Sequence, residues 1–290
     1  MTQFLDLRIQ PVGGELAKTV ATCQGSSLAN YTGMLWDDLL NAVQGRHVLI
    51  ATHGFNVDRE NGVASLSNWQ SLLQLPAGSA FLGLLWPGDS VWAHGLDYPG
   101  EPRVADDAGA LLAQFIDTNF QNVASLSFAS HSLGARVVLA TIANLKMPVR
   151  RLTLMAGAID DDCLTTEFSS AAAKVGTISA LASMKDTVLS RLFPLGNFVG
   201  GILTAGHPWW HAAIGHCGPA QSWPDNFEAP FAIPDAWSFN HGNYLQVNQP
   251  PAPSLGLPVV VPGQGAAEPF GGMAGWQESF TAGFESTRFR

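Results

Sequence analysis

The stretch ASLSFASHSLGARVV, residues 124–138, joins a short apolar run to a segment whose apolar residues have helical spacing. The run predicts a buried strand, and the segment after it predicts a helix. Between them, SHSLG matches the G-x-S-x-G pattern of a sharp strand-to-helix turn, with Ser130 and Gly134 as its small residues. Such a turn lifts the central hydroxyl, here that of Ser132, above the carboxyl edge of a sheet. The sequence therefore predicts a nucleophile at this edge.

The same alternation of strand and helix continues along the chain. Near-continuous apolar runs, typical of strands buried on both faces, occupy 47–54, 79–88, 124–130, 151–158 and 175–183. Apolar residues at helical spacing fill 62–75, 103–120 and 135–147. This order predicts an α/β fold, with a mostly parallel sheet covered by helices on both faces. The segments 4–12 and 15–23 can add an antiparallel start to that sheet.

Composition and charge narrow the function classes. The 290 residues are 47% hydrophobic and 13% charged, which predicts a single ordered domain over residues 1–290. The formal net charge is -9 and no basic block exceeds Arg150–Arg151, so we expect no nucleic-acid partner. The nearest candidate for a membrane span, Leu192–Gly206, is broken by Pro194 and Asn197, which argues against an integral membrane protein.

The N-terminus and the cysteines bear on the compartment. The first ten residues, MTQFLDLRIQ, lack the basic start and the apolar core of a secretory signal, so we expect a cytoplasmic protein, with secretion as the open alternative. Cys23, Cys163 and Cys217 lie far apart and are odd in number, which favours reduced thiols over a disulfide framework.

A second element supports a catalytic role for the SHSLG turn, which by itself also fits an ordinary turn whose serine caps a helix. The stretch ATHGFNVD, residues 51–58, follows an earlier predicted strand, where this architecture places the other half of an oxyanion hole. His53 and Gly54 would form the turn, with His53 bonded to the backbone. The N–H of Phe55 would then face the N–H of Leu133 at the start of the helix, and both could stabilise an oxyanion.

Taken together, HGFN at 53–56, WPGD at 86–89 and SHSLG at 130–134 resemble the esterase- and lipase-like group of the α/β-hydrolase superfamily. Members of that group carry an H-G-F-N oxyanion loop, a W-P turn and an A-H-S-M-G-like elbow. The resemblance spans roughly residues 45–245, with Ser130 standing where the family has Gly or Ala. It implies an α/β-hydrolase fold and a carboxylesterase or lipase-like serine hydrolase that needs no cofactor. An acyltransferase, amidase or peptidase would use the same residues and stays open.

The resemblance also implies that an acid and then a histidine follow the serine in the chain. Asp186 lies in the S-x-x-D-x-x-L-S pattern and is the expected acid. Asp160, which follows the preceding predicted strand, is the alternative, although the acidic run 160–162 also fits the N-terminus of a helix. His241 in FNHGNYL matches the final catalytic histidine of the family. His131 is expected to point away from the serine hydroxyl as a packed or capping residue.

Two segments depart from the family pattern. We expect a lid-like insertion over 187–236, because the run from Leu192 to Pro224 contains no charged residue and is rich in Gly, Pro and Trp. A rigid structural insertion or a homodimer contact is the alternative. The Pro-rich stretch 246–290 is expected to form an extended C-terminal arm. The side chains expected to bind a small hydrophobic ester substrate are Trp209, Trp210 and Phe198.

The run HPWWHAAIGHC offers a competing arrangement of metal ligands. Its candidate ligands are His207, His211, His216 and Cys217. Histidines four residues apart can bind zinc on one face of a helix, but Pro208 and Gly215 interrupt a continuous helix and no carboxylate lies within the run. We therefore expect no metal site here.

Overall fold

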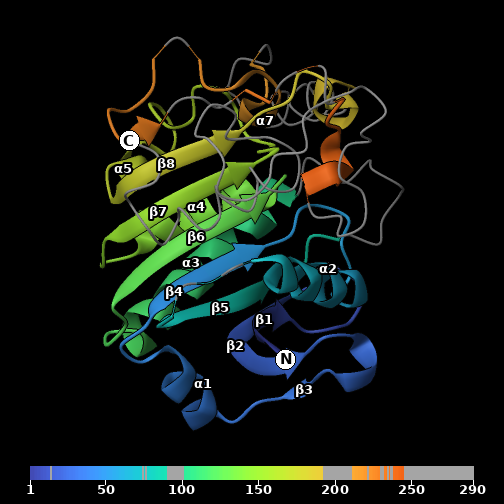
Figure 1. Ribbon diagram of the computed structural model, residues 1–290, viewed down its shortest axis with the longest axis vertical. Helices are drawn as coiled ribbons and strands as arrows, with labels where there is room; N and C mark the ends of the chain where they lie inside the picture. The colour runs from blue at the N-terminus through green and yellow to red at the C-terminus, as the bar shows by residue number, and fades with distance from the viewer. Residues whose placement is uncertain are drawn as a thin grey trace.

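The computed structural model describes residues 1–13, 15–73, 75, 77–89, 101–191, 211–220, 222–228, 232–233, 235 and 238–244. Within them, nine strands form one sheet in the order β3-β2-β1-β5-β4-β6-β7-β8-β9 (Figure 1). The strands are β1 Thr2–Arg8, β2 Leu16–Gly25, β3 Thr32–Gly33, β4 His47–Thr52, β5 Ser79–Leu85, β6 Ser125–His131, β7 Val149–Met155, β8 Val175–Leu181 and β9 Phe227–Glu228. The pairings of β2 with β1 and β3 are antiparallel, and the others are parallel.

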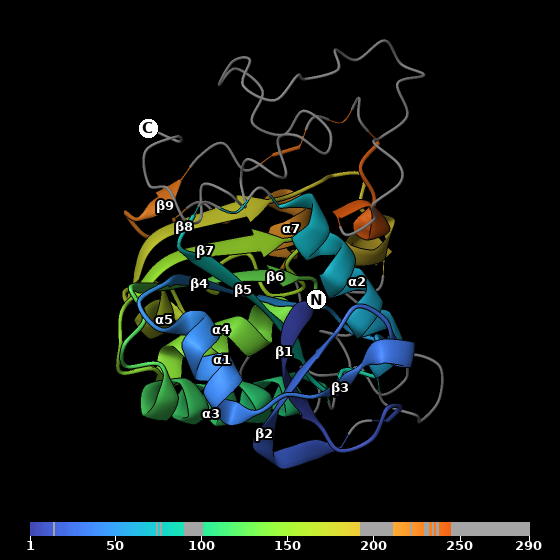
Figure 2. The same ribbon diagram turned by 60° about the horizontal axis from the view of Figure 1, so that its bottom comes forward.

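The helices cover both faces of this sheet. Across the sheet, the step from β4 to β5 runs toward β1, whereas the steps from β5 to β6, β7 and β8 run toward β9. Because parallel crossovers are right-handed, the two directions place their helices on opposite faces. Accordingly, α2 lies on one face, and α3, α4 and α5 lie together on the other (Figure 2). Their bounds are α2 Arg59–Leu72, α3 Glu101–Asn119, α4 Gly134–Asn144 and α5 Ser169–Ala172.

Shorter elements complete the described chain. They are α1 Trp36–Val43, α7 Ile214–Cys217, and the 3-10 helices η1 Leu28–Asn30 and η3 His241–Tyr244. No helix in the described residues is long and apolar enough to cross a membrane. Cys23, Cys163 and Cys217 are free thiols, as their spacing predicts.

The predicted α/β architecture, including its antiparallel start, is confirmed. The predicted strand over 151–158 instead ends at Met155, because Ala156 takes a left-handed backbone with φ 46° that a strand does not continue. The two-residue strand β9 lies within 187–236, so this part of the segment expected as a lid belongs to the sheet. Residues 192–210 of the expected lid segment and the whole arm over 246–290 lie outside the described residues.

Candidate active site

Ser132 occupies the sharp turn between β6 and α4. Its backbone has φ 55°, a left-handed conformation that costs a non-glycine residue about 1–3 kcal/mol and persists only when its surroundings fix it. Here the end of β7 supplies that support, because the Ser132 N–H donates to the Met155 carbonyl at 3.0 Å and the Ala158 N–H donates to the Ser132 carbonyl at 3.1 Å. Ser132 at the centre of SHSLG therefore has the strained backbone that is typical of such a sharp turn.

Close backbone approach explains the glycines on both sides of this turn. A Cβ atom on Gly134 would lie 2.4 Å from the carbonyl oxygen of His53, and one on Gly54 would lie 2.6 Å from the Ser132 Cβ. Both distances are far below van der Waals contact, so neither position accepts a side chain. The HGFN loop after β4 is thus pressed directly against the serine.

A chain of hydrogen bonds joins Ser132 to His241 and Asp186. The Oγ atom of Ser132 lies 2.9 Å from Nε2 of His241, and Nδ1 of His241 lies 2.7 Å from Oδ2 of Asp186. The carboxylate, which is fully buried, fixes the proton of the imidazole on Nδ1 and leaves Nε2 to accept the serine proton. It is Asp186, and not the alternative Asp160, whose carboxylate lies beside His241.

The loops that carry the acid and the histidine are tied to each other. The second carboxylate oxygen of Asp186 accepts hydrogen bonds from the N–H groups of Val188 and Leu189 at 3.0 and 2.9 Å. The side-chain oxygen of Asn240 accepts from the N–H of His241 at 2.8 Å and from the N–H of Thr187 at 3.1 Å. Asn240 therefore links the two loops directly.

His131 packs beneath the histidine loop, as its place in the elbow predicts. Its ring centroid lies 4.8 Å from that of His241, and its Nε2–H donates to the carbonyl oxygen of His241 at 2.9 Å. Burial, together with the neighbouring His241, lowers the pKa of His131 to about 3. The His131 ring is therefore neutral at pH 7.

The expected oxyanion donors also lie at this turn. Leu133 follows the serine and is buried at the start of α4, and within the described part of the chain its N–H has no hydrogen-bond acceptor. Phe55 lies in the HGFN loop, between Gly54 and Asn56. The N–H of Asn56 donates to the Gly88 carbonyl at 2.7 Å. His53 bonds to the backbone, as expected, with Nδ1 2.9 Å from the carbonyl oxygen of Gly54. Burial lowers the pKa of His53 to about 4.

The acidic run and the histidine-rich run meet elsewhere. Nδ1 of His211 lies 2.9 Å from Oδ1 of Asp161, and Nε2 lies 3.7 Å from Oδ2 of Asp162. The hydrogen bond to Asp161 raises the pKa of His211. His216 has a different partner, since its Nδ1 lies 3.1 Å from the Ser183 carbonyl. His211 and His216, the two histidines of the run that the structure describes, therefore have different partners, and His211 lies beside carboxylates that are far away in the sequence.

The acidic run does not begin a helix, because α5 starts only at Ser169 and turns occupy 161–168. Among the remaining predicted residues, His207 and the expected substrate-binding side chains Trp209, Trp210 and Phe198 lie outside the described residues. Asn240 was not singled out from the sequence, although its place directly before His241 is a usable signal.

Residues 33–193 match the family described as alpha/beta hydrolase of unknown function (DUF900), over more than half of the chain. No curated protein matches the sequence. The solved structure of esterase PE8 is similar at 17% identity and a TM-score of 0.35, over 53% of this chain and 81% of that one.

The structure of a metagenome-derived lipolytic enzyme of the LipS and LipT pair is similar at 16% identity and a TM-score of 0.27, over 40% of this chain and 44% of that one. The structure of phospholipase PlaB from Legionella pneumophila is similar at 18% identity and a TM-score of 0.26, over 42% of this chain and 27% of that one. The chain thus spans less than two thirds of either protein.

Proposed function

The chain belongs to the alpha/beta hydrolase family of unknown function, and from this premise we propose that it is a serine hydrolase that cleaves carboxylic esters. Ser132 would be the nucleophile, His241 the general base and Asp186 the residue that orients the imidazole. The observation that carries the proposal is the continuous line of hydrogen bonds from the Asp186 carboxylate through His241 to the Ser132 hydroxyl. This is the arrangement that activates a serine for acyl transfer.

In the proposed acylation, the Ser132 oxygen attacks the ester carbonyl while its proton passes to Nε2 of His241. The buried Asp186 stabilises the imidazolium that forms. Negative charge develops on the former carbonyl oxygen, and the N–H groups of Leu133 and Phe55 would donate to it. The leaving alkoxide then takes the proton from His241, which leaves an acyl group on Ser132.

Deacylation would repeat these steps with water as the nucleophile. His241 takes a proton from water, the hydroxide attacks the acyl carbon, and the Ser132 oxygen leaves and regains its proton from His241. His131 takes no part in proton transfer here, because at pH 7 it is neutral and its Nε2–H is bonded to a backbone carbonyl. All proton movement is thereby assigned to His241.

The substrate pocket is proposed on the sequence alone. The uncharged run within 187–236 would form a lid whose inner face, with Trp209, Trp210 and Phe198, contacts the apolar part of a small ester. Because a lid of this kind excludes water, it would favour hydrophobic acyl or alcohol groups. Such a substrate fits the absence of charge from the run, since an ionic substrate would require side chains of opposite charge.

The test is a panel of aryl esters of increasing acyl length, combined with labelling by a fluorophosphonate probe. We expect turnover of at least one ester and a single labelled peptide that contains Ser132. Ser132→Ala should remain folded, should not be labelled and should lose several orders of magnitude in turnover. Labelling at Ser130 instead, or undiminished turnover by Ser132→Ala, would contradict the assignment.

The same assay separates the reactions that share these residues. Added alcohol that diverts most of the acyl group into a new ester would identify an acyltransferase, and faster cleavage of the matching anilides would identify an amidase. For an esterase we expect the free acid as the main product in both cases.

A further inference from the structure

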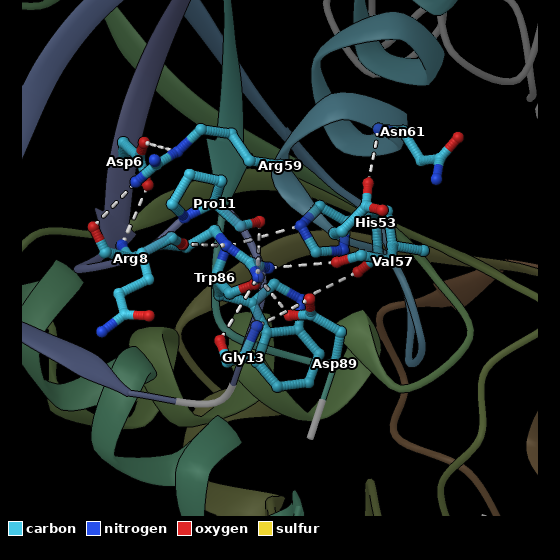
Figure 3. A network of polar contacts seen from close by, with 12 residues as sticks. Asp6, Arg8, Pro11, Gly13, His53, Val57, Arg59, Asn61, Trp86 and Asp89 are labelled. Atoms are coloured by element: carbon cyan, nitrogen blue, oxygen red, sulfur yellow. Dashed lines mark hydrogen bonds and ion pairs between the residues drawn. The ribbon is translucent and has the colours of Figure 1, made fainter. Parts of the chain in front are cut away.

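One buried arginine ties together the backbone segments around the expected oxyanion hole. Arg8 ends β1, and its side chain is fully buried. Its guanidinium donates to the carbonyl oxygens of Val57 at 3.0 Å and Trp86 at 2.9 Å, and it forms an ion pair with Asp89 (Figure 3). Weaker bonds of 3.3 to 3.4 Å reach the carbonyls of Gln10, Pro11 and Gly13.

The Trp86 carbonyl and Asp89 belong to the W-P-G-D turn, residues 86–89, which follows β5. This turn holds the backbone of the oxyanion loop, residues 53–57, through one side-chain and one backbone hydrogen bond. The indole N–H of Trp86 donates to the His53 carbonyl at 3.0 Å, and the Asn56 N–H donates to the Gly88 carbonyl at 2.7 Å. The loop is therefore held by the W-P-G-D turn on both sides of Phe55.

Arg8 joins these two segments at one point, because a single nitrogen of its guanidinium serves both the Val57 and the Trp86 carbonyls. The parallel pairing of β1 with β5, which aligns Asp6 with Leu85, brings Arg8 to this position. A second ion pair supports it, since Arg59 bonds to Asp6 at 2.8 Å and to the Arg8 carbonyl at 3.0 Å. The arginine is thus held rigidly below the loop that it binds.

The loop needs such support because part of it is strained. Asn56 has φ 58°, in the left-handed region that residues other than glycine seldom adopt. Without fixed neighbours, a relaxed Asn56 would rotate the peptide groups on either side of it, and this movement would displace the adjacent Phe55 together with its N–H. A displacement of about 1 Å at a catalytic group can cost on the order of 100-fold in rate.

We propose that Arg8, with Asp89 as its counter-ion, is a positioning residue of the oxyanion hole that fixes the direction of the Phe55 N–H. This inference rests on the proposed function. It assigns the N-terminal strand a role in the reaction although Arg8 touches no reacting atom. A lysine would keep the charge at this site, but its single ammonium group cannot replace the planar fork of N–H donors that reaches all of these acceptors.

The test compares Arg8→Lys and Asp89→Asn with the wild-type protein, using the best aryl ester of the panel. We expect kcat to fall about ten- to hundredfold in Arg8→Lys while KM stays nearly constant, because the lost interaction belongs to the transition state. An arylboronic acid, which forms a tetrahedral adduct with the serine, should bind more weakly by a similar factor. Amide hydrogen exchange of the peptide containing 53–57 should become faster. Asp89→Asn should show the same pattern, more weakly, and remains informative if Arg8→Lys does not fold.

Arg151→Lys is the matched control, because Arg151 is a buried arginine of the same sheet that pairs with Glu228 on β9. It should lose stability without the selective loss of kcat and boronic acid affinity. If Arg8→Lys and Asp89→Asn lose only stability, as the control does, the positioning role is overturned. Failure of the wild-type protein to react with the fluorophosphonate probe at Ser132 would instead overturn the proposed function, and the inference with it.

Discussion

The Nε2 atom of His131 lies 2.9 Å from the backbone carbonyl oxygen of His241, which is 110 residues later in the chain. This hydrogen bond docks the loop that carries the expected base onto the turn that carries the expected nucleophile. The two rings also pack at 4.8 Å between centroids. The residue before Ser132 thus contributes to the distance between the serine hydroxyl and the imidazole.

Replacing His131 by Phe should lower catalysis through this contact. The phenyl ring keeps the packing but donates no hydrogen bond, and a lost bond of this kind is worth about 1 kcal/mol, or roughly a fivefold change in rate. His131→Gln, whose amide can donate to the same carbonyl, is the control and should retain more activity. Steady-state kinetics on one aryl ester measures both variants, and equal activity of the two would contradict the docking role.

Asp186→Asn and Asp160→Asn should have very different effects. An amide at position 186 would favour the wrong imidazole tautomer of His241, which in a serine triad costs about 10⁴-fold in kcat. Asp160 forms an isolated backbone bridge with Ala213, which the substitution leaves intact, and the carboxylate bonded to His241 is that of Asp186, so Asp160→Asn should change turnover little. Comparison of kcat at pH 8 tests this ranking, and the reverse order would identify Asp160 as the acid.

Much of the candidate site can be predicted from the sequence, because the local backbone conformation restricts which residue types can occupy it. A strained turn needs small flanking residues, so SHSLG marks Ser132, and close approach to that turn explains the glycine of HGFN. The choice between Asp186 and Asp160 needed the resemblance to a family, because both follow a buried strand. Only the folded chain shows which carboxylate lies beside His241, because Asp186 is 55 residues away from it in the sequence.

Other features carry no local signal. β9 has two residues, too few for any period of apolar side chains to appear. Arg8 is a single charged residue at the end of a predicted strand, and its burial depends on contacts with Trp86 and Asp89, about 80 residues away. The pairing of His211 with Asp161 likewise depends on two loops that meet only in the fold. Pairings over such sequence distances cannot be deduced from pattern alone.

Replacing Trp209 or Trp210 by Ala should change the preferred acyl length if the lid proposal is correct. Each methylene buried against the indole rings would contribute up to about 0.8 kcal/mol, so the variants should lose their preference for longer chains and keep the rate on acetate esters. The measurement is kcat/KM across the aryl ester series. Unchanged chain-length profiles, accompanied by loss of a homodimer or of thermal stability, would show that the run is structural.

Stability should fall as the pH drops below about 6.5, because His53 and His131 are buried without charge. Their pKa values are about 4 and about 3 in the folded protein, against an ordinary value of 6.5. Below pH 6.5 the unfolded chain therefore binds more protons than the folded one, and each histidine lowers the free energy of unfolding by up to about 1.4 kcal/mol per pH unit until its folded pKa is reached.

Urea unfolding of the wild-type protein and His131→Gln at several pH values between 4 and 7 isolates one histidine, since all other groups titrate in both proteins. The difference in unfolding free energy between the two should change with pH by about that slope below pH 6.5 and become constant above it. Parallel curves over the whole range would show that His131 is not held neutral.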